Sequence, residues 1–172
     1  LTGDLAFSPD STRFAMASEM GSILVWSLSN SPLQLRIEST NRIEGLFFTR
    51  DGREIVRISQ ADGSLQWLDA VSGEQTRELN TGVGSITCAA LSPRADVVRI
   101  GETTPRMRLV DLVSGKVELL PSDMGSVTAV AWSLDGRTIA AGTFEGFVKL
   151  WSAPTRRELD LLRALDEILL ER

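Results

Sequence analysis

The chain has 172 residues, of which 42% are hydrophobic and 24% charged, with a formal net charge of -5. This apolar content is sufficient for a packed core, while the acidic balance argues against nucleic acid as a partner, because nucleic-acid-binding surfaces concentrate Lys and Arg. No apolar run reaches the roughly 18 to 20 residues that span a bilayer, so we expect no membrane segment. The single cysteine, Cys88, allows no intramolecular disulfide, which fits a cytoplasmic protein.

Two short patterns recur along the chain with one period. An apolar residue followed by a turn occurs four times, at spacings of 41, 43 and 41 residues: Phe7-Ser-Pro-Asp10, Phe48-Thr-Arg-Asp51, Leu91-Ser-Pro-Arg94 and Trp132-Ser-Leu-Asp135. A second landmark follows in each unit, at spacings of 42, 42 and 41 residues: Trp26-Ser27, Leu68-Asp69, Val110-Asp111 and Trp151-Ser152. Self-similarity at a fixed period is the sequence signature of repeat architectures.

Each unit carries the signals of four short strands. In the fourth unit we expect strands at residues 127–132, 138–143 and 147–151, separated by turns at residues 133–136 and 145–146. Fourth strands are expected near residues 33–38, 75–79 and 116–120 of the first three units. Four strands in an antiparallel sheet, repeated every 40 or so residues, are typical of a β-propeller blade. We therefore predict an all-β chain of four four-stranded antiparallel blades: residues 1–40, 41–82, 83–123 and 124–163.

The last unit also supports a family resemblance. The stretch from Val127 to Trp151, together with Leu5-Ala-Phe-Ser-Pro-Asp10 and Val110-Asp-Leu-Val-Ser-Gly-Lys116, resembles the WD-repeat (WD40-type) family. The resemblance covers residues 1 to about 163 and implies a β-propeller that acts as a protein-interaction scaffold. WD repeats often carry a buried hydrogen-bonded set that includes a Ser or Thr on the second strand. Here those positions hold other side chains, so we expect packing to hold the blades together: Met16, Ile58, Ile100 and Ala141.

Four blades are half of the seven- or eight-bladed ring that the resemblance implies. The two end faces would then expose apolar side chains, for which we propose Phe7, Val25, Val148 and Leu150. Either a second copy completes an eight-bladed ring, or missing blades of the same polypeptide do. The second alternative is favoured here because the chain lacks an initiator Met and starts abruptly at a strand.

The C-terminal tail, residues 164–172, has apolar residues at helical spacing. We expect a short C-terminal helix there, which either covers an exposed edge or binds a partner.

The sequence contains no arrangement that predicts catalysis. It has no His, no motif for a nucleophile with its base, and no spacing typical of a metal site, so we expect no enzyme, no cofactor and no metal. Cys88 is interpreted as a small buried hydrophobe. The alternative is a propeller portion of an enzyme whose active site uses residues from missing blades. That alternative requires polar clusters on the first strands, which instead offer mostly small residues: Asp4, Ala6, Gly45, Thr87, Ala89 and Thr128.

Partner binding needs only loops, and the resemblance places two kinds of loop on one rim of a propeller. These join the second strand to the third and the fourth strand to the next blade. Large or charged residues at these loops are candidates for protein contact: Met20, Arg42, Arg106, Phe144 and Glu145. Phe144 is the strongest candidate, since a Phe in a tight turn contributes little to folding.

Overall fold

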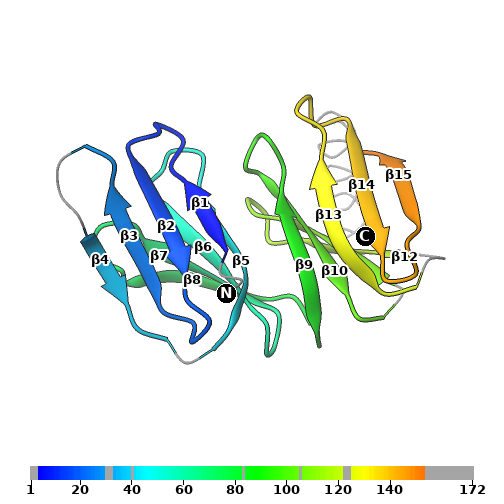
Figure 1. The fold of residues 1–172 in the computed structure, drawn as a ribbon, viewed down its shortest axis with the longest axis horizontal. Helices are drawn as coiled ribbons and strands as arrows, with labels where there is room; N and C mark the ends of the chain where they lie inside the picture. The colour runs from blue at the N-terminus through cyan, green and yellow to red at the C-terminus, as the bar shows by residue number, and fades with distance from the viewer. Residues whose placement is uncertain are drawn as a thin grey trace, which may run out of the picture.

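The computed structural model describes residues 4–29, 33–39, 41–82, 84–104, 106–121 and 125–153. Within these ranges the chain forms fifteen strands and no helix, so the all-β prediction is confirmed. The strands make four antiparallel sheets that follow one another along the chain (Figure 1). The part of the chain described contains no helix long and apolar enough to cross a membrane. The predicted C-terminal helix and the fourth strand of the last unit lie outside the described residues.

In every sheet the strands are hydrogen-bonded in simple chain order. Sheet 1 consists of β1 (Leu5–Phe7), β2 (Arg13–Ala17), β3 (Ile23–Ser27) and β4 (Leu33–Ile37). Sheet 2 consists of β5 (Ile43–Phe48), β6 (Glu54–Ser59), β7 (Ser64–Asp69) and β8 (Gln75–Asn80). Sheet 3 consists of β9 (Ile86–Leu91), β10 (Val97–Glu102), β11 (Arg106–Asp111) and β12 (Val117–Pro121). Sheet 4 shows β13 (Val127–Trp132), β14 (Thr138–Thr143) and β15 (Val148–Ser152) within the described residues.

The turn after the first strand is fixed by a repeated aspartate. In sheet 1 the Ser8 hydroxyl donates a 2.6 Å hydrogen bond to Asp10, whose carboxylate also accepts from the Thr12 amide at 3.0 Å. These bonds favour the charged carboxylate and hold the pKa of Asp10 down at about 2. Equivalent hydroxyl-to-carboxylate bonds join Thr49 to Asp51 and Ser133 to Asp135. The landmark found in the sequence is therefore a turn with a specific hydrogen-bonded structure.

The sheets are held together by burying apolar faces against one another. We call the face toward the preceding sheet the leading face, and the face toward the following sheet the trailing face. The first interface packs the trailing face of sheet 1 on the leading face of sheet 2, with these buried side chains: Ala15, Ala17, Ile23, Val25, Leu46, Phe48, Ile55 and Leu68. A second cluster joins sheets 2 and 3 around Trp67 and Val98, and a third joins sheets 3 and 4 around Met107 and Val127.

One of the four residues predicted to lie on an open end face lies elsewhere in the structure. Val25 is fully buried between sheets 1 and 2, so its assignment to an exposed face was wrong. The reason is register: Val25 pairs with Ala15 on the trailing face, whereas Phe7, Phe14 and Trp26 share the other face. Phe7 is exposed, as are Val148 and Leu150 of sheet 4.

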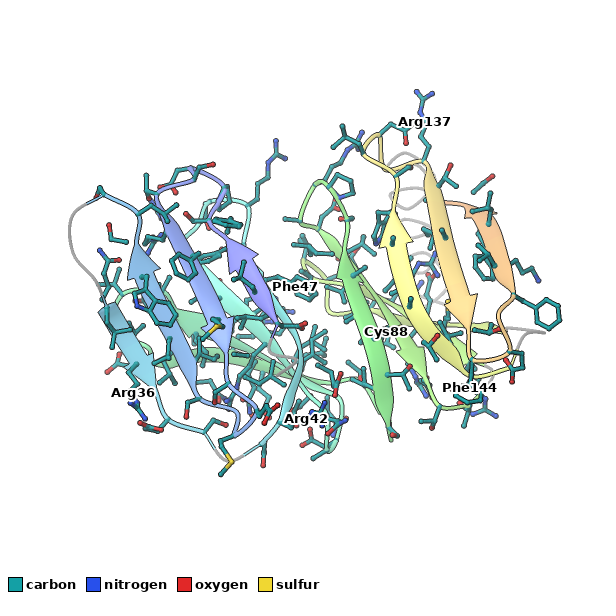
Figure 2. All side chains as sticks on the ribbon, viewed as in Figure 1. Arg36, Arg42, Phe47, Cys88, Arg137 and Phe144 are labelled. Carbon is teal, nitrogen blue, oxygen red and sulfur yellow. The ribbon has the colours of Figure 1, made fainter. Side chains whose placement is uncertain are left out.

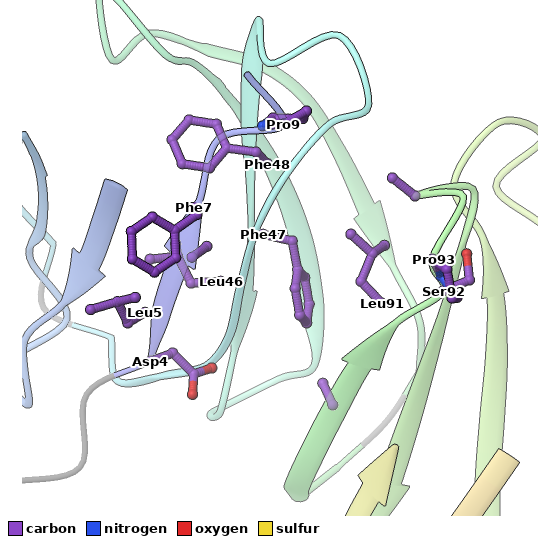
Figure 3. A pocket seen from close by; sticks show the side chains of 13 residues that line it. Asp4, Leu5, Phe7, Pro9, Leu46, Phe47, Phe48, Leu91, Ser92 and Pro93 are labelled. Atoms are coloured by element: carbon purple, nitrogen blue, oxygen red, sulfur yellow. The ribbon is translucent and has the colours of Figure 1, made fainter. Parts of the chain in front are cut away.

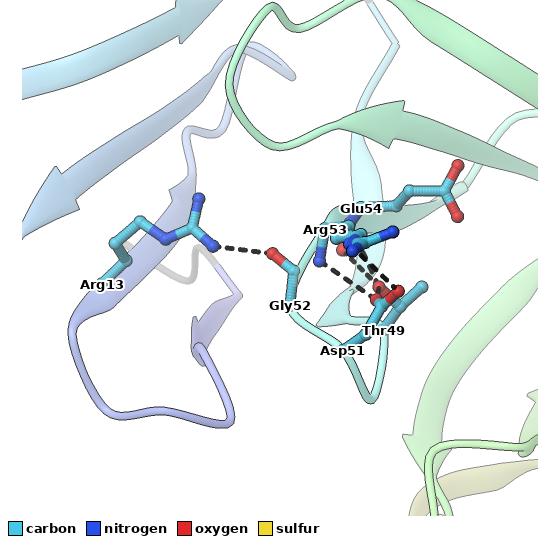
Figure 4. A network of polar contacts seen from close by, with 6 residues as sticks. All are labelled: Arg13, Thr49, Asp51, Gly52, Arg53 and Glu54. Carbon is cyan, nitrogen blue, oxygen red and sulfur yellow. Dashed lines mark hydrogen bonds and ion pairs between the residues drawn. The ribbon is translucent and has the colours of Figure 1, made fainter.

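Polar side chains also bridge neighbouring sheets near the same end of the strands. The guanidinium of Arg13 in sheet 1 donates a 2.6 Å hydrogen bond to the carbonyl of Gly52 in the β5–β6 turn (Figure 4). Arg77 of sheet 2 lies 4.5 Å from the centre of the Trp67 ring and donates to the Leu112 carbonyl of sheet 3 at 2.9 Å. Such bonds to backbone carbonyls fix how one sheet sits on the next.

Between sheets 3 and 4 a charged side chain occupies a core position. Arg99 is only 3% exposed, and its Nε and Nη1 atoms have no hydrogen-bond partner. Its guanidinium lies 5.9 Å from the centre of the Trp132 ring. Because burial removes water from the charged guanidinium, it lowers the pKa of Arg99 to about 10.

We expect Arg99→Met to raise the free energy of unfolding, by about 1 to 3 kcal/mol, because it removes a buried charge with unsatisfied donors and keeps an apolar stem. Urea denaturation followed by tryptophan fluorescence measures the change. Arg108→Met is the matched control, since the Arg108 guanidinium is bonded to Glu102 at 2.7 Å, and its loss should destabilise by about 3 to 5 kcal/mol. A destabilised Arg99→Met protein would contradict this account.

The turn aspartates predict a loss of stability in acid. Hydrogen bonds lower the pKa values of Asp10, Asp51 and Asp135 in the folded chain. The unfolded chain therefore takes up protons first, and the free energy of unfolding should fall as the pH drops from about 4 toward 2. Burial raises the pKa values of Asp4 and Glu44, whose opposite effect operates only above about pH 4.

Urea midpoints measured at pH 6, 4 and 3 test this acid dependence. Asp10→Asn, which keeps an acceptor oxygen in the turn but cannot titrate, should flatten the fall below pH 4. An unchanged slope in that variant would remove Asp10 from the explanation.

Candidate functional site

The described parts of the loops predicted to bind a partner lie at the same end of the strands, which we call the rim. This rim comprises the β2–β3, β6–β7, β10–β11 and β14–β15 turns and the loops that lead from one sheet to the next. A methyl group at Gly21 would collide with the carbonyl oxygen of Asn41, so the β2–β3 turn lies directly on the β4–β5 loop. The Thr81 hydroxyl in the β8–β9 loop donates a 2.8 Å hydrogen bond to the Gly63 carbonyl in the β6–β7 turn. In sheets 1 and 2, therefore, the turn between the second and third strands rests on the loop that follows the fourth strand.

All five predicted rim residues are exposed in the structure. Met20 and Phe144 are 78% and 83% exposed, and Arg42, Arg106 and Glu145 are also on the surface. Figure 2 shows Arg42 and Phe144 at the lower edge, whereas Arg137, from the β13–β14 turn, lies at the upper edge.

The structure brings these residues together only in part. Phe144 and Glu145 share one turn, and the turn of Met20 touches the loop that contains Arg42. Arg106 is the first residue of β11 in sheet 3. They are spread along the rim, so a partner would have to be large enough to reach several sheets. Their contact with a partner stays a prediction.

Beneath the rim lie polar contacts that the sequence did not predict. The Arg108 guanidinium bonds to Glu102 at 2.7 Å and to the Thr81 carbonyl at 3.2 Å, with Glu102 itself buried. In sheet 2, Gln60 donates a 2.7 Å hydrogen bond to Glu44. The sequence places the acidic Glu102 on the second strand and the basic Arg108 on the third strand of one unit, and this opposite charge could have predicted their ion pair. These bonds hold the second-strand ends in place beneath the exposed side chains.

A second feature missed from the sequence is a groove of about 420 Å³ along the first strands of sheets 1 to 3. Its wall is mixed but more apolar than polar, with Phe47 of β5 directed toward Leu91 of β9, and Leu5 and Phe7 on the side of β1 (Figure 3). Asp4 lies at one end, where burial raises the pKa of its carboxyl. The prediction of mostly small residues on the first strands overlooked Phe47 and Leu91. Successive residues of a strand point to opposite faces of the sheet, and applying this alternation to the first strands could have identified Phe47 and Leu91.

The titratable groups of the described residues do not converge on a reactive arrangement. Cys88 lies on β9, and burial raises the pKa of its thiol, which disfavours the reactive thiolate. The neighbouring Thr87 hydroxyl is engaged with the carbonyl of Val127. The described part of the chain holds no group of three or more His, Cys, Asp or Glu side chains that could bind a metal ion.

Comparisons with known proteins agree with this architecture. Residues 117–152 match the family described as WD domain, G-beta repeat. The chain is 27% identical over 139 residues to the small ribosomal subunit protein RACK1y of Oryza sativa subsp. japonica, a match that covers 76% of this chain and 40% of that protein. It is 22% identical over 152 residues to the apoptotic protease-activating factor 1 of Mus musculus, with 87% of this chain and 12% of that protein covered.

The chain thus spans less than half the length of these relatives. The features of this chain that fit such a repeat are its fixed period, the strand and turn order of the last unit, and a separate small sheet for each repeat. Residues 117–152 therefore match a WD repeat, and the four sheets of the described residues are consistent with a segment of a WD-type β-propeller.

Proposed function

We propose that this chain is a non-catalytic scaffold that binds a protein partner through its rim. The observation that carries the proposal is the presence of two large apolar side chains, Met20 and Phe144, at exposed turn tips of sheets 1 and 4. Apolar side chains held away from the core gain nothing from folding, while Met, Phe and Arg are enriched where proteins meet. Arg42 and Arg106 add donors along the same rim, and Glu145 adds an acceptor beside Phe144.

The relatives give this proposal general support. WD-type repeats are interaction modules, and the name of the rice relative makes that protein part of a ribosomal subunit. We propose a cytoplasmic location for this chain as well, a setting with which its one cysteine, Cys88, is compatible. We propose further that the open faces of sheets 1 and 4 are covered when the protein is assembled.

Phe144→Ala should leave folding unaffected, because the Phe144 side chain makes few contacts at 83% exposure. The free energy of unfolding should change by less than about 0.5 kcal/mol. The matched substitution Phe48→Ala removes a ring that is 4% exposed and should cost about 3 to 5 kcal/mol. Urea denaturation of both variants tests the pair, and a large loss in Phe144→Ala would assign this side chain to the core.

Photo-crosslinking tests partner binding at the rim. A benzophenone amino acid is placed at position 144 or 20, and at position 134 of the opposite rim as the control, where Leu134 is 94% exposed. In the cells that make the protein, crosslinks to one partner should form from positions 144 and 20 and be absent from position 134. Equal crosslinking from all three positions, or from position 134 alone, would contradict the proposed rim.

A further inference from the structure

The groove of about 420 Å³ lies where neighbouring sheets approach most closely, along their first strands. Strand β5 contacts both β1 and β9, and each of these strands is an edge of its own sheet. Sheets arranged around an axis pack against one another through their faces, whereas their inner edges border a central space. The groove is therefore part of the wall of that space, which further sheets beside the described ones would leave open.

The floor of the groove does not depend on the ends of the chain. Leu5 and Phe7 of β1 are exposed on a sheet with one neighbour within the described residues, so a preceding sheet would cover them. Phe47 and Leu91 lie in sheets 2 and 3, each of which already has a sheet on both sides. Both side chains nevertheless remain only half-buried and line the groove. Their partial exposure is thus a property of sheets that are already fully packed.

A small side chain in sheet 3 contributes to the hollow. At one first-strand position sheet 3 carries Ala89, whereas the equivalent residues of the other sheets are larger: Leu5, Leu46 and Val130. Ala89 and Phe47 both line the groove, and the Phe47 ring is directed across it toward Leu91 (Figure 3). A mainly apolar hollow of this size lies within the range of small-molecule sites, about 300 to 1,000 Å³.

One carboxylate lies at the end of the groove nearer the rim. Asp4 precedes β1, and its carboxylate accepts a hydrogen bond from the backbone of Leu46. Asp4 forms no ion pair within the part of the chain described, whereas the nearby Glu44 is paired with Arg42 at 3.3 Å. Partial burial raises the pKa of Asp4, because the charged form loses contact with water, and a cation beside it would favour the charged form again.

We propose that this groove binds a small organic cation that has a compact apolar body and one amine. The apolar body packs against Phe47 and Leu91, and the ammonium group donates hydrogen bonds to the carboxylate of Asp4. The opposite end of the groove lies between Pro9 of the β1–β2 turn and Pro93 of the β9–β10 turn. These turns lie at the end of the strands away from the rim. The site is therefore separate from the proposed partner contact.

Three probe molecules with one apolar body test the charge. Phenethylamine, phenethyl alcohol and hydrocinnamate carry the same phenylethyl group with a positive, a neutral and a negative end. NMR titration of the isotope-labelled chain should shift the backbone amides of Phe47, Ala89 and Leu91 with the amine and the alcohol. The amine should bind about fivefold more tightly than the alcohol, which is the gain expected from one exposed ion pair. The carboxylate should bind more weakly than the alcohol.

Three single substitutions separate the parts of the site. Asp4→Asn keeps an acceptor for the Leu46 amide but has no charge, so it should abolish the preference for the amine and leave the affinity for the alcohol unchanged. Leu91→Phe introduces the residue that sheets 1 and 2 carry at this position, so the fold should tolerate it, and the larger ring should weaken binding of every probe. Glu74→Gln is the control, because it removes an exposed charge from the β7–β8 turn outside the groove and should change no affinity.

Thermal unfolding verifies that each variant is folded, and four results would then overturn the proposal. The first is the absence of amide shifts at the groove with the amine. The second is an amine that binds no more tightly than the alcohol. The third is a preference for the amine that survives Asp4→Asn or is lost equally in Glu74→Gln. The fourth is unchanged binding in Leu91→Phe. These results are independent of the rim, because Met20 and Phe144 do not line the groove.

Discussion

Burial of one sheet face against the next is the interaction on which the rest of this molecule depends. A four-stranded sheet with two apolar faces cannot bury either face alone, so each sheet needs a neighbour on both sides. Sheets 2 and 3 have two neighbours and hold many of the most deeply buried side chains, among them Ile55, Val98 and Ile100. Sheets 1 and 4 each have only one neighbour within the described residues. Their outer faces are therefore uncovered, and Phe7 and Leu150 on these faces are exposed.

Directional bonds give this packing its geometry. Apolar contact alone would allow the sheets to slide, whereas the bonds from Arg13 to Gly52 and from Arg77 to Leu112 tie each sheet to carbonyls of the next. At the third interface the Trp132 indole donates to the Ala90 carbonyl at 3.2 Å. Arg99 in that interface is the exception, because it buries a charge where sheet 1 has Ala15 and sheet 2 has Val56. The third interface is thus built with less apolar contact than the first two.

The fold was predictable because its signals are local. The turn at Asp10 and the landmark at Trp26 recur at a fixed period, and the strands between them follow from alternation and turn chemistry. The exposure of Met20 and Phe144 also followed from their places in turns. Which face a strand residue occupies depends on register across the whole sheet, and one residue of slip reverses it.

This dependence on register explains the error at Val25. The groove beside Phe47 and Leu91 was missed for a related reason: it forms where strands far apart in the chain come side by side. The pairing of Arg108 with Glu102 and the Thr81 carbonyl likewise requires three segments to meet. Sequence periodicity describes each unit well, but it does not describe the spaces between units.

The equivalence of successive interfaces has a consequence for how such a chain can change in length. Because successive sheets meet through equivalent positions of the repeat, a duplicated unit of 41 to 43 residues would find similar positions to contact on both sides, with Arg99 as the main departure. Gain or loss of a whole repeat therefore changes the number of sheets rather than the chemistry of the contact between two neighbouring sheets. A deletion that ends inside a strand would instead leave the neighbouring strands with unpaired backbone groups.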